Sequence, residues 1–345
     1  MIAISWHGLP QYAARMIKVF CDQSKEEIQV IGTRPLVPIR GMEEALARPI
    51  LWIDETRERM SWADLGLKVP DVFVQAGWTF RPFVSLGRAV KTNGGKVIGL
   101  CDNCYRGDLR QYGGAVLFRL LYRASFDAML VPGQSAKRLM TFYGMPANRI
   151  ACGMYGADPN LFKLGPSLVS RPKTVLFVGQ FIKRKGVDTL CRAFARLHKK
   201  YPEWRLHLCG DGPLREQFVG LPGITVDGFV QPQKLSEIYH QARFFVFPSL
   251  QENWGLVVHE AALSGCALLM SDVVGSAHDF ASSSNSILFQ SGSEDALYKA
   301  LSEAIAWDNS HYEAAQNESY KRAAQFGPAQ FSLSLEGLIQ EVQAK

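Results

Sequence analysis

The sequence of 345 residues has no apolar run of about 18 residues, the length that a membrane-spanning helix needs. The N-terminal segment Met1–His7 carries no Lys or Arg, whereas a secretory signal peptide begins with a positively charged region. Neither a membrane span nor a signal peptide is therefore expected, and the sequence predicts a cytoplasmic protein.

Cysteine is sparse, with seven residues scattered mostly through apolar segments. An odd and scattered set argues against a disulfide framework and favours buried thiols in a reducing compartment. Cys101 and Cys104 have the spacing of zinc ligands, but no second pair lies within reach. The sequence thus predicts no metal site and no resident cofactor.

Several common nucleotide and metal motifs are also missing. A Gly-x-Gly sequence at 210–212 lacks the third glycine of a dinucleotide fingerprint. His259-Glu260 lacks the second histidine of a zinc protease, and Lys185-Gly186 does not belong to a P-loop. No Asp-x-Asp sequence is present to hold a metal-bound diphosphate.

The net charge of +6 is unevenly distributed. Residues 1–165 hold 21 Lys and Arg against 14 Asp and Glu, whereas residues 166–345 hold 17 against 18. One interpretation is an arginine-rich, solvated surface. The other is a first domain that meets a phospholipid surface, a lipid-linked phosphate or a phosphorylated sugar. Nucleic acid is not expected, because no zinc finger, basic heptad region or aromatic RNA-binding strand occurs.

Apolar strands alternate with helices twice along the chain. In the first half, Ile2–Ser5 and Lys96–Leu100 are typical of buried strands, and Tyr12–Cys21 has helical spacing. A linker is expected at 164–172, before the alternation restarts at Thr174–Val178. This pattern predicts an α/β fold with two Rossmann-like, doubly wound domains facing each other across a cleft.

The most informative stretch is Pro248–Glu260. The strand Arg243–Phe247 leads into it, and a helix expected to begin near Asn253 leads out. Glu252 and Glu260 bracket the turn, and the amides at a helix start form an anion site between them. This arrangement indicates a ligand that is part sugar and part diphosphate.

Two residues near this site have alternative interpretations. Lys185 precedes a helix, where a cation can neutralise a leaving diphosphate, or it is a solvated member of the Lys183–Lys185 run. Glu260 lies in an apolar helix, where an unpaired carboxylate is unfavourable. It either accepts two ribose hydroxyls or forms a buried structural ion pair.

Segments of the second half resemble the large retaining glycosyltransferase family 4, the glycosyl transferases group 1, whose members have the GT-B fold. The resemblance covers most of residues 172–290, is weaker across 126–162 and is faint before residue 100. The segments are Val178–Gly186, Cys209–Leu214, Asp227–Val230, Ser271–Ser276 and Pro248–Ala261, the last with a Glu-x7-Glu spacing.

The resemblance implies a donor site in the second half. Glu260 would hold the ribose, Glu252 would face the transferred sugar as a catalytic group, and Lys185 would stabilise the leaving diphosphate. Gln180 stands where the family usually has Arg, and Arg184 could supply the missing charge. Further donor-binding residues would be Gly228, Phe229, Val230, Asn253, Trp254, Gly255, Leu256 and Val257.

The resemblance also implies roles at two strand ends of the first half. The Gly8 amide would approach the diphosphate, and His7 would contact the acceptor, unless it is simply structural. Cys101 replaces a histidine of the family. Asp102 and Asn103 would bind the acceptor, with Asp102 also a catalytic candidate.

These expectations define a metal-independent hexosyltransferase that moves a sugar from a nucleotide diphosphate sugar to a glycan or lipid-linked hydroxyl. Bacterial polysaccharide, lipopolysaccharide or glycolipid synthesis would use it. Residues 1–165 would bind the acceptor, 166–327 the donor, and the helix 328–345 would return to the first domain.

The basic, apolar helix Leu109–Ser125 indicates a peripheral position on an anionic membrane surface, at its inner face. The alternative functions are a sugar-nucleotide epimerase, a glycan phosphorylase, or a non-catalytic sugar-nucleotide-binding protein.

Overall fold

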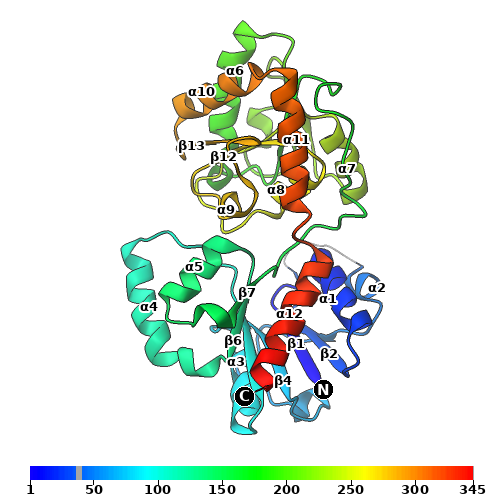
Figure 1. Ribbon diagram of the computed structural model, residues 1–345, viewed down its shortest axis with the longest axis vertical. Coiled ribbons are helices and arrows are strands. Elements are labelled where there is room, and N and C mark those ends of the chain that lie inside the picture. The colour runs from blue at the N-terminus through cyan, green and yellow to red at the C-terminus, as the bar shows by residue number, and fades with distance from the viewer. Residues whose placement is uncertain (36–40, 345) are drawn as a thin grey trace. The chain divides into compact units, whose positions relative to one another are not determined.

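The computed structural model describes residues 1–35 and 41–344, which pack into two compact units (Figure 1). Unit 1 comprises Met1–Gly156 together with the C-terminal segment from Phe326, and unit 2 comprises Ala157–Gln325. The C-terminal segment belongs to unit 1 because its helix α12 (Pro328–Gln343) packs along α1 (Gln11–Gln23).

Unit 1 is built on a parallel sheet of seven strands in the order β3-β2-β1-β4-β5-β6-β7. The first strand lies near the centre, and the strand order reverses between β1 and β4. The strands are β1 (Ile2–Trp6), β2 (Ile28–Gly32), β3 (Leu51–Trp52), β4 (Val72–Ala76), β5 (Lys96–Leu100), β6 (Ala128–Val131) and β7 (Ile150–Cys152).

Helices cover both faces of this sheet because successive strand residues point to opposite sides. Ile2 and Ile4 pack with α1 and α12, whereas Ala3 and Phe73 lie on the other side with α3, α4 and α5. The remaining helices of unit 1 are α2 (Met42–Leu46), α3 (Arg81–Thr92), α4 (Leu109–Leu121) and α5 (Gln134–Phe142).

Unit 2 repeats this design with six parallel strands in the order β10-β9-β8-β11-β12-β13. Its strands are β8 (Thr174–Val178), β9 (Arg205–Cys209), β10 (Ile224–Asp227), β11 (Phe244–Phe247), β12 (Ala267–Ser271) and β13 (Ser286–Phe289). Its helices are α6 (Val187–Lys200), α7 (Pro232–His240), α8 (Leu256–Leu263), α9 (Ala277–Phe280), α10 (Glu294–Ile305) and α11 (Asn309–Ala323).

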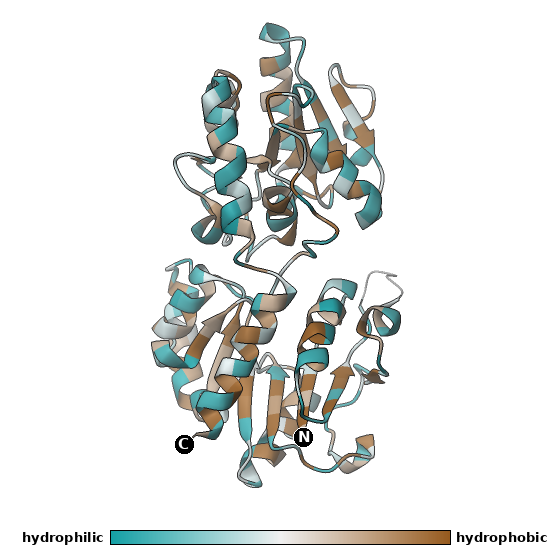
Figure 2. Ribbon diagram, turned by 45° about the vertical axis from the view of Figure 1, so that its right-hand side comes forward, coloured by the Kyte–Doolittle hydropathy of each residue, from teal (hydrophilic) through white to brown (hydrophobic). Residues whose placement is uncertain are grey.

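The predicted α/β architecture of two doubly wound, parallel halves is confirmed. Figure 2 shows the strands of both sheets in hydrophobic colours, as expected where helices cover both faces. In the described part of the chain, no helix has both the length and the apolar character needed to cross a bilayer.

The segment expected to be a linker, 164–172, packs into unit 2. Arg171 is buried and donates hydrogen bonds to four backbone carbonyls. Its Nη2 lies 2.7 Å from the oxygen of Ser264, and its Nη1 lies 3.1 Å and 3.0 Å from those of Tyr239 and Ala242. The fourth acceptor is Pro166, 2.9 Å from Nε. This guanidinium joins three separate backbone segments.

Candidate functional site

The first group of predicted site residues lies in unit 2, where the strand order reverses between β8 and β11. Because these strands are parallel neighbours, the loops that follow them emerge side by side at the carboxyl edge of the sheet. Two hydrogen bonds of 2.8 Å join the loops, from the Leu250 amide to the Arg184 carbonyl and from Arg184 Nη1 to the Gln251 carbonyl.

Lys185 and Glu252 meet at this reversal point. The Lys185 ammonium donates to Glu252 Oε2 and lies 5.0 Å from the centre of the Phe247 ring. Both charged side chains are only 13% exposed, and burial lowers the pKa of Lys185 against the opposing effect of Glu252. Arg184 Nη1 lies 3.9 Å from the same carboxylate. The structure therefore brings three predicted site residues together.

Gly186 fixes the close approach of the two loops. Its φ of +67° is a left-handed conformation, and a Cβ atom there would lie 2.1 Å from the Pro248 carbonyl oxygen. Only glycine fits such a position. The geometry thus explains why glycine follows Lys185 in the sequence. Gly186 lets the loop that carries Lys185 pack against the loop that carries Glu252.

The helix predicted to begin near Asn253 instead begins at Leu256, so that prediction was wrong by three residues. Gly255 has a φ of +92°, outside the helical region. The backbone before it pairs with another loop, since the Gly275 and Ser276 amides donate to the Glu252 and Trp254 carbonyls, at 3.2 Å and 3.3 Å. Asn253 lies at a bend of this segment, ahead of the first helical turn.

Glu260 lies one helical turn past Leu256 and Val257, on α8. Its Oε2 accepts a hydrogen bond from the Tyr239 hydroxyl at 3.0 Å, and that hydroxyl also lies 3.2 Å from the Val257 carbonyl. Burial raises the pKa of Glu260 to about 7, partly offset by the Tyr239 hydrogen bond. In the described residues its partner is a neutral hydroxyl, and no structural ion pair occurs within 4.0 Å.

Buried hydrogen bonds hold α8 in place. His259 Nδ1 accepts from the Ala157 amide at 2.9 Å, and Nε2 lies 2.9 Å from the Ala323 carbonyl. These partners require a neutral imidazole with the proton on Nε2, in agreement with a pKa that burial lowers to about 4. Trp254 Nε1 donates to Asp279 at 3.0 Å. Sequence reasoning assigned no role to His259, Tyr239 or Asp279.

The remaining predicted donor residues follow β8 and β10 at the same edge of the sheet. Gln180 is exposed just after β8. Phe229 follows β10 and is 65% exposed, with its ring available for stacking. Gly228 accepts a hydrogen bond from the Gly210 amide at 3.1 Å, and Val230 is half-buried beside it.

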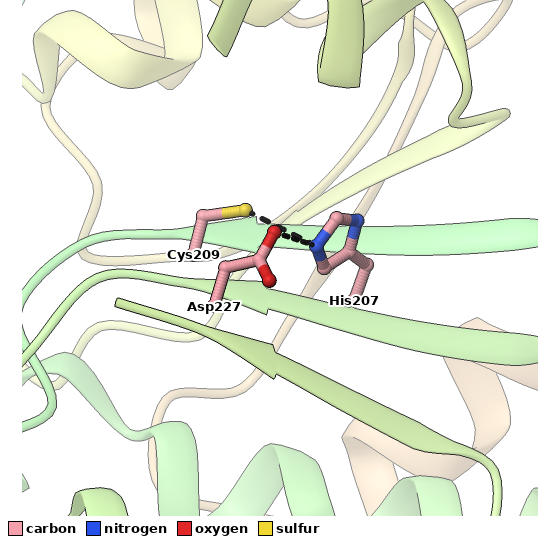
Figure 3. A group of neighbouring side chains, drawn as sticks. All are labelled: His207, Cys209 and Asp227. Atoms are coloured by element: carbon pink, nitrogen blue, oxygen red, sulfur yellow. Dashed lines mark hydrogen bonds and ion pairs between the residues drawn. The ribbon is translucent and has the colours of Figure 1, made fainter. Parts of the chain in front are cut away.

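One group of possible metal ligands in unit 2 was missed by the sequence analysis (Figure 3). His207 Nε2 lies 2.9 Å from Asp227 Oδ2 and 3.5 Å from Cys209 Sγ. All three ligand atoms lie within 4.8 Å of one another. His207 and Cys209 point to one face of β9, so the His-x-Cys alternation was the available signal. Burial raises the pKa of Cys209 to about 12, which favours the neutral thiol in a hydrogen-bonded group.

Unit 1 contains a pocket of about 560 Å³ at its own point of strand reversal. The pocket lies beyond the ends of β1, β4 and β5, and four aromatic residues form part of its walls. Its lining residues include Trp6, His7, Trp78, Phe80, Cys101, Asp102, Asn103 and Tyr155. The predicted acceptor residues therefore lie together, although sequence reasoning did not find the aromatic residues around them.

Asp102 accepts a hydrogen bond from the Tyr155 hydroxyl at 3.2 Å. The Tyr155 ring packs against Trp6 and Tyr12, and burial raises the pKa of both tyrosines far above their ordinary value. The neutral Tyr155 hydroxyl therefore orients the carboxylate. Asn103 is exposed beside Asp102.

The other predicted residues of unit 1 have definite partners. His7 Nε2 lies 3.6 Å from Glu55, and its ring meets Phe80 edge-on. The Gly8 amide donates to Thr33 Oγ1 at 2.7 Å, so its hydrogen bond is already satisfied within the unit. Cys101 is buried, and burial raises its pKa to about 12. A neutral thiol therefore occupies the position where the family that this sequence resembles commonly has histidine.

Two parallel α/β units, each with its strand order reversing beside its first strand, place the protein in the GT-B class. Anabaena HepE in complex with UDP has the same fold at 15% identity, with a TM-score of 0.78 over 99% of both chains. Sucrose-phosphate synthase from Thermosynechococcus elongatus matches 99% of both chains at 16% identity and a TM-score of 0.72.

Residues 172–306, which lie in unit 2, match the family model of the glycosyl transferases group 1. A 2-deoxystreptamine N-acetyl-D-glucosaminyltransferase of Niallia circulans is 31% identical over 140 residues, 37% of this chain and 36% of that protein. The sulfoquinovosyl transferase SQD2 of Arabidopsis thaliana is 32% identical over 165 residues, 43% and 31% of the two chains. The chain thus aligns with about a third of the length of these relatives.

Proposed function

We propose that this protein is a retaining glycosyltransferase of the hexosyl type, with a nucleotide diphosphate sugar as donor. The observation that carries the proposal is the half-buried Lys185–Glu252 pair at the strand reversal of unit 2. UDP is the proposed leaving nucleotide, supported by the UDP complexes of Anabaena HepE and of the pneumococcal O-GlcNAc transferase GtfA.

The Lys185–Glu252 pair supports a role in leaving-group stabilisation. An incoming diphosphate adds negative charge, so the ammonium can be shared with a phosphate while Glu252 turns toward the sugar hydroxyls. Low solvent exposure strengthens such interactions. The Leu256 and Val257 amides lie in the first turn of α8, where backbone N–H groups have no carbonyl partner within the helix. These two amides can therefore donate hydrogen bonds to the phosphate.

We propose that the reaction needs no divalent ion and no separate base. The bond from the anomeric carbon to the diphosphate breaks, and the acceptor oxygen bonds to that carbon on the same face. The acceptor proton passes to an oxygen of the leaving diphosphate. Glu260 would accept two hydroxyl hydrogen bonds from the ribose when ionised, and the exposed Phe229 ring would lie near the base.

The proposed acceptor is a glycan or a lipid-linked sugar, bound in unit 1. Its pocket supports this choice, because Trp6, Trp78 and Tyr155 offer apolar surface for a sugar ring, with polar groups of Asp102 and Asn103 beside them. Bacterial polysaccharide, lipopolysaccharide or glycolipid synthesis supplies such acceptors. The protein would act in the cytoplasm, at the inner face of the membrane.

A thermal-shift screen of nucleoside diphosphates, followed by assay of the matching nucleotide sugars, tests the proposal. UDP should raise the melting temperature, and a UDP-sugar should release UDP. Lys185→Ala should lower the rate of UDP release by about 10²-fold or more, whereas Lys183→Ala, at an exposed neighbour, should leave it unchanged. Sugar phosphate formed from glycan and inorganic phosphate would indicate a phosphorylase instead. A changed sugar on the recovered donor would indicate an epimerase, and binding without turnover a non-catalytic protein.

A further inference from the structure

Helix α4 of unit 1 has an apolar outer face. Of the 16 large hydrophobic side chains that are exposed in the described chain, six lie on this helix of 13 residues. Their exposure ranges from 51% for Leu117 to 89% for Leu109. The six residues, which we call the α4 apolar face, are Leu109, Tyr112, Val116, Leu117, Leu120 and Leu121.

The packing of α4 fixes which side points outward. Ala115 and Phe118 are buried, and the Phe118 ring lies 5.0 Å from that of Trp78. The exposed residues at 109, 112, 116 and 120 are spaced by three and four positions, so they form one stripe along the opposite side. Leu117 and Leu121 widen the stripe. The apolar face therefore cannot turn inward without unpacking the helix.

Cations lie on α4 and on the segments next to it. Residues 104–144 contain six Lys and Arg but only two Asp and Glu. Arg110 is exposed on α4 itself, and Arg138 lies 4.1 Å above the Tyr105 ring. Lys137 and Arg138 line a pocket of about 440 Å³ with Phe142, whose ring lies 5.1 Å from that of Tyr112.

We infer that the α4 apolar face binds the surface of an anionic phospholipid bilayer, with the helix lying in the plane of the interface. An apolar stripe flanked by Lys and Arg matches what such interfacial helices need, since the apolar side chains enter the acyl boundary and the cations meet anionic headgroups. Figure 1 places α4 at the side of unit 1, next to α5.

The alternative occupant is a second copy of the chain. A two-fold symmetric contact through α4 would place the same patch on both sides. Residues 104–144 carry six cations against two anions, so such a contact would bring two segments of net charge +4 together, which is electrostatically unfavourable. An anionic surface satisfies both the apolar stripe and these charges, so the observations favour the membrane.

Membrane binding would also serve the acceptor pocket, a point that rests on the proposed function. Asn103 at the pocket precedes Leu109 by six residues, a chain length that spans at most about 20 Å. A bilayer bound to α4 would therefore lie near the pocket of the same unit. This arrangement favours an acceptor whose lipid stays in the bilayer while its sugar is bound by the protein.

Vesicle flotation tests the inference. The protein should float with phosphatidylcholine vesicles that contain phosphatidylglycerol at low salt, and float poorly with pure phosphatidylcholine or in high salt. The variant Leu117→Glu/Leu120→Glu should lower the partition coefficient at least tenfold. Leu333→Glu is the matched control, because Leu333 is 62% exposed on α12 of the same unit and should change partition less than twofold.

Two further measurements distinguish a specific loss of membrane binding from a loss of the fold or of UDP binding. Circular dichroism of each variant checks that the fold is kept, and UDP-induced thermal shifts should be the same in all of them because α4 lies outside unit 2. The inference is overturned if the wild-type protein does not float with anionic vesicles at low salt. It is also overturned if Leu333→Glu lowers the partition coefficient as much as Leu117→Glu/Leu120→Glu does. A wild-type dimer that the α4 variant makes monomeric also overturns it. Failure of UDP binding with intact flotation would overturn only the proposed function.

Discussion

Replacing Glu260 by glutamine should stabilise unit 2 at neutral pH while weakening the donor site. Burial raises the pKa of this carboxyl from 4.5 to about 7. A carboxyl with a higher pKa in the folded state than in the unfolded state binds its proton more tightly when folded. Its contribution to stability is therefore greatest below pH 4.5 and falls as the pH rises toward 7.

The size of the effect follows from the two pKa values. Each pKa unit corresponds to about 1.4 kcal/mol, so ionising Glu260 in the fold costs about 3 kcal/mol by pH 8. Glutamine has the same shape, carries no charge and still offers an oxygen to the Tyr239 hydroxyl. For a domain of this size, the melting temperature should rise by roughly 6 to 12 °C at pH 8. The difference should disappear near pH 4.

Thermal unfolding of both proteins between pH 4 and 8 measures this difference, with the exposed Glu237→Gln on α7 as control. In parallel, wild-type affinity for UDP should increase from pH 6 to pH 8, because only the ionised carboxylate accepts both ribose hydroxyls. The glutamine variant should bind UDP more weakly at pH 8 and with little pH dependence. An equal or lower melting temperature for Glu260→Gln at pH 8 would refute the reasoning.

Three other predictions follow from contacts in unit 2. Lys185→Ala should lower kcat by about 10²- to 10³-fold, whereas Glu260→Ala should mainly raise the donor KM; unchanged steady-state kinetics in both would contradict the site. EDTA should leave the transfer rate unchanged within twofold, and a loss that Mg²⁺ restores would contradict metal-independent chemistry. Arg171→Met should destabilise the unit by about 3 kcal/mol or more, because it leaves buried carbonyls unpaired. The melting temperature of Arg171→Met should be well below that of the control Arg205→Met, which changes an exposed arginine. Equal melting temperatures for the two variants would contradict this role of Arg171.

The fold was predictable because its signal is local and repeated. Buried strands such as Phe244–Phe247 and Ala267–Ser271 are continuous apolar runs, and helices separate them. The start of α8 was not predictable in the same way. Gly255 and the pairing of Glu252 with Val274 delay the helix, and that pairing depends on a loop more than 20 residues away.

The site was only partly predictable because its contacts join distant residues. Lys185 and Glu252 are 67 positions apart, and they meet because β8 and β11 are neighbours in the sheet. Tyr239 looks like an ordinary core residue of α7, yet it is the hydrogen-bond partner of Glu260. In unit 1, Trp6, Trp78 and Tyr155 come from three separate segments, so no short motif reveals their shared pocket.

The same topological position carries different kinds of side chain in the two units. In unit 2 the strand reversal between β8 and β11 carries the charges of Lys185 and Glu252. In unit 1 the reversal between β1 and β4 is surrounded by aromatic rings, with Asp102 oriented by Tyr155. A diphosphate needs buried positive charge, whereas a sugar ring needs apolar faces with a few fixed polar groups. This contrast supports a donor in unit 2 and an acceptor in unit 1, and it predicts that Trp78→Ala should raise the acceptor KM without changing UDP affinity, as titrations with each substrate can establish.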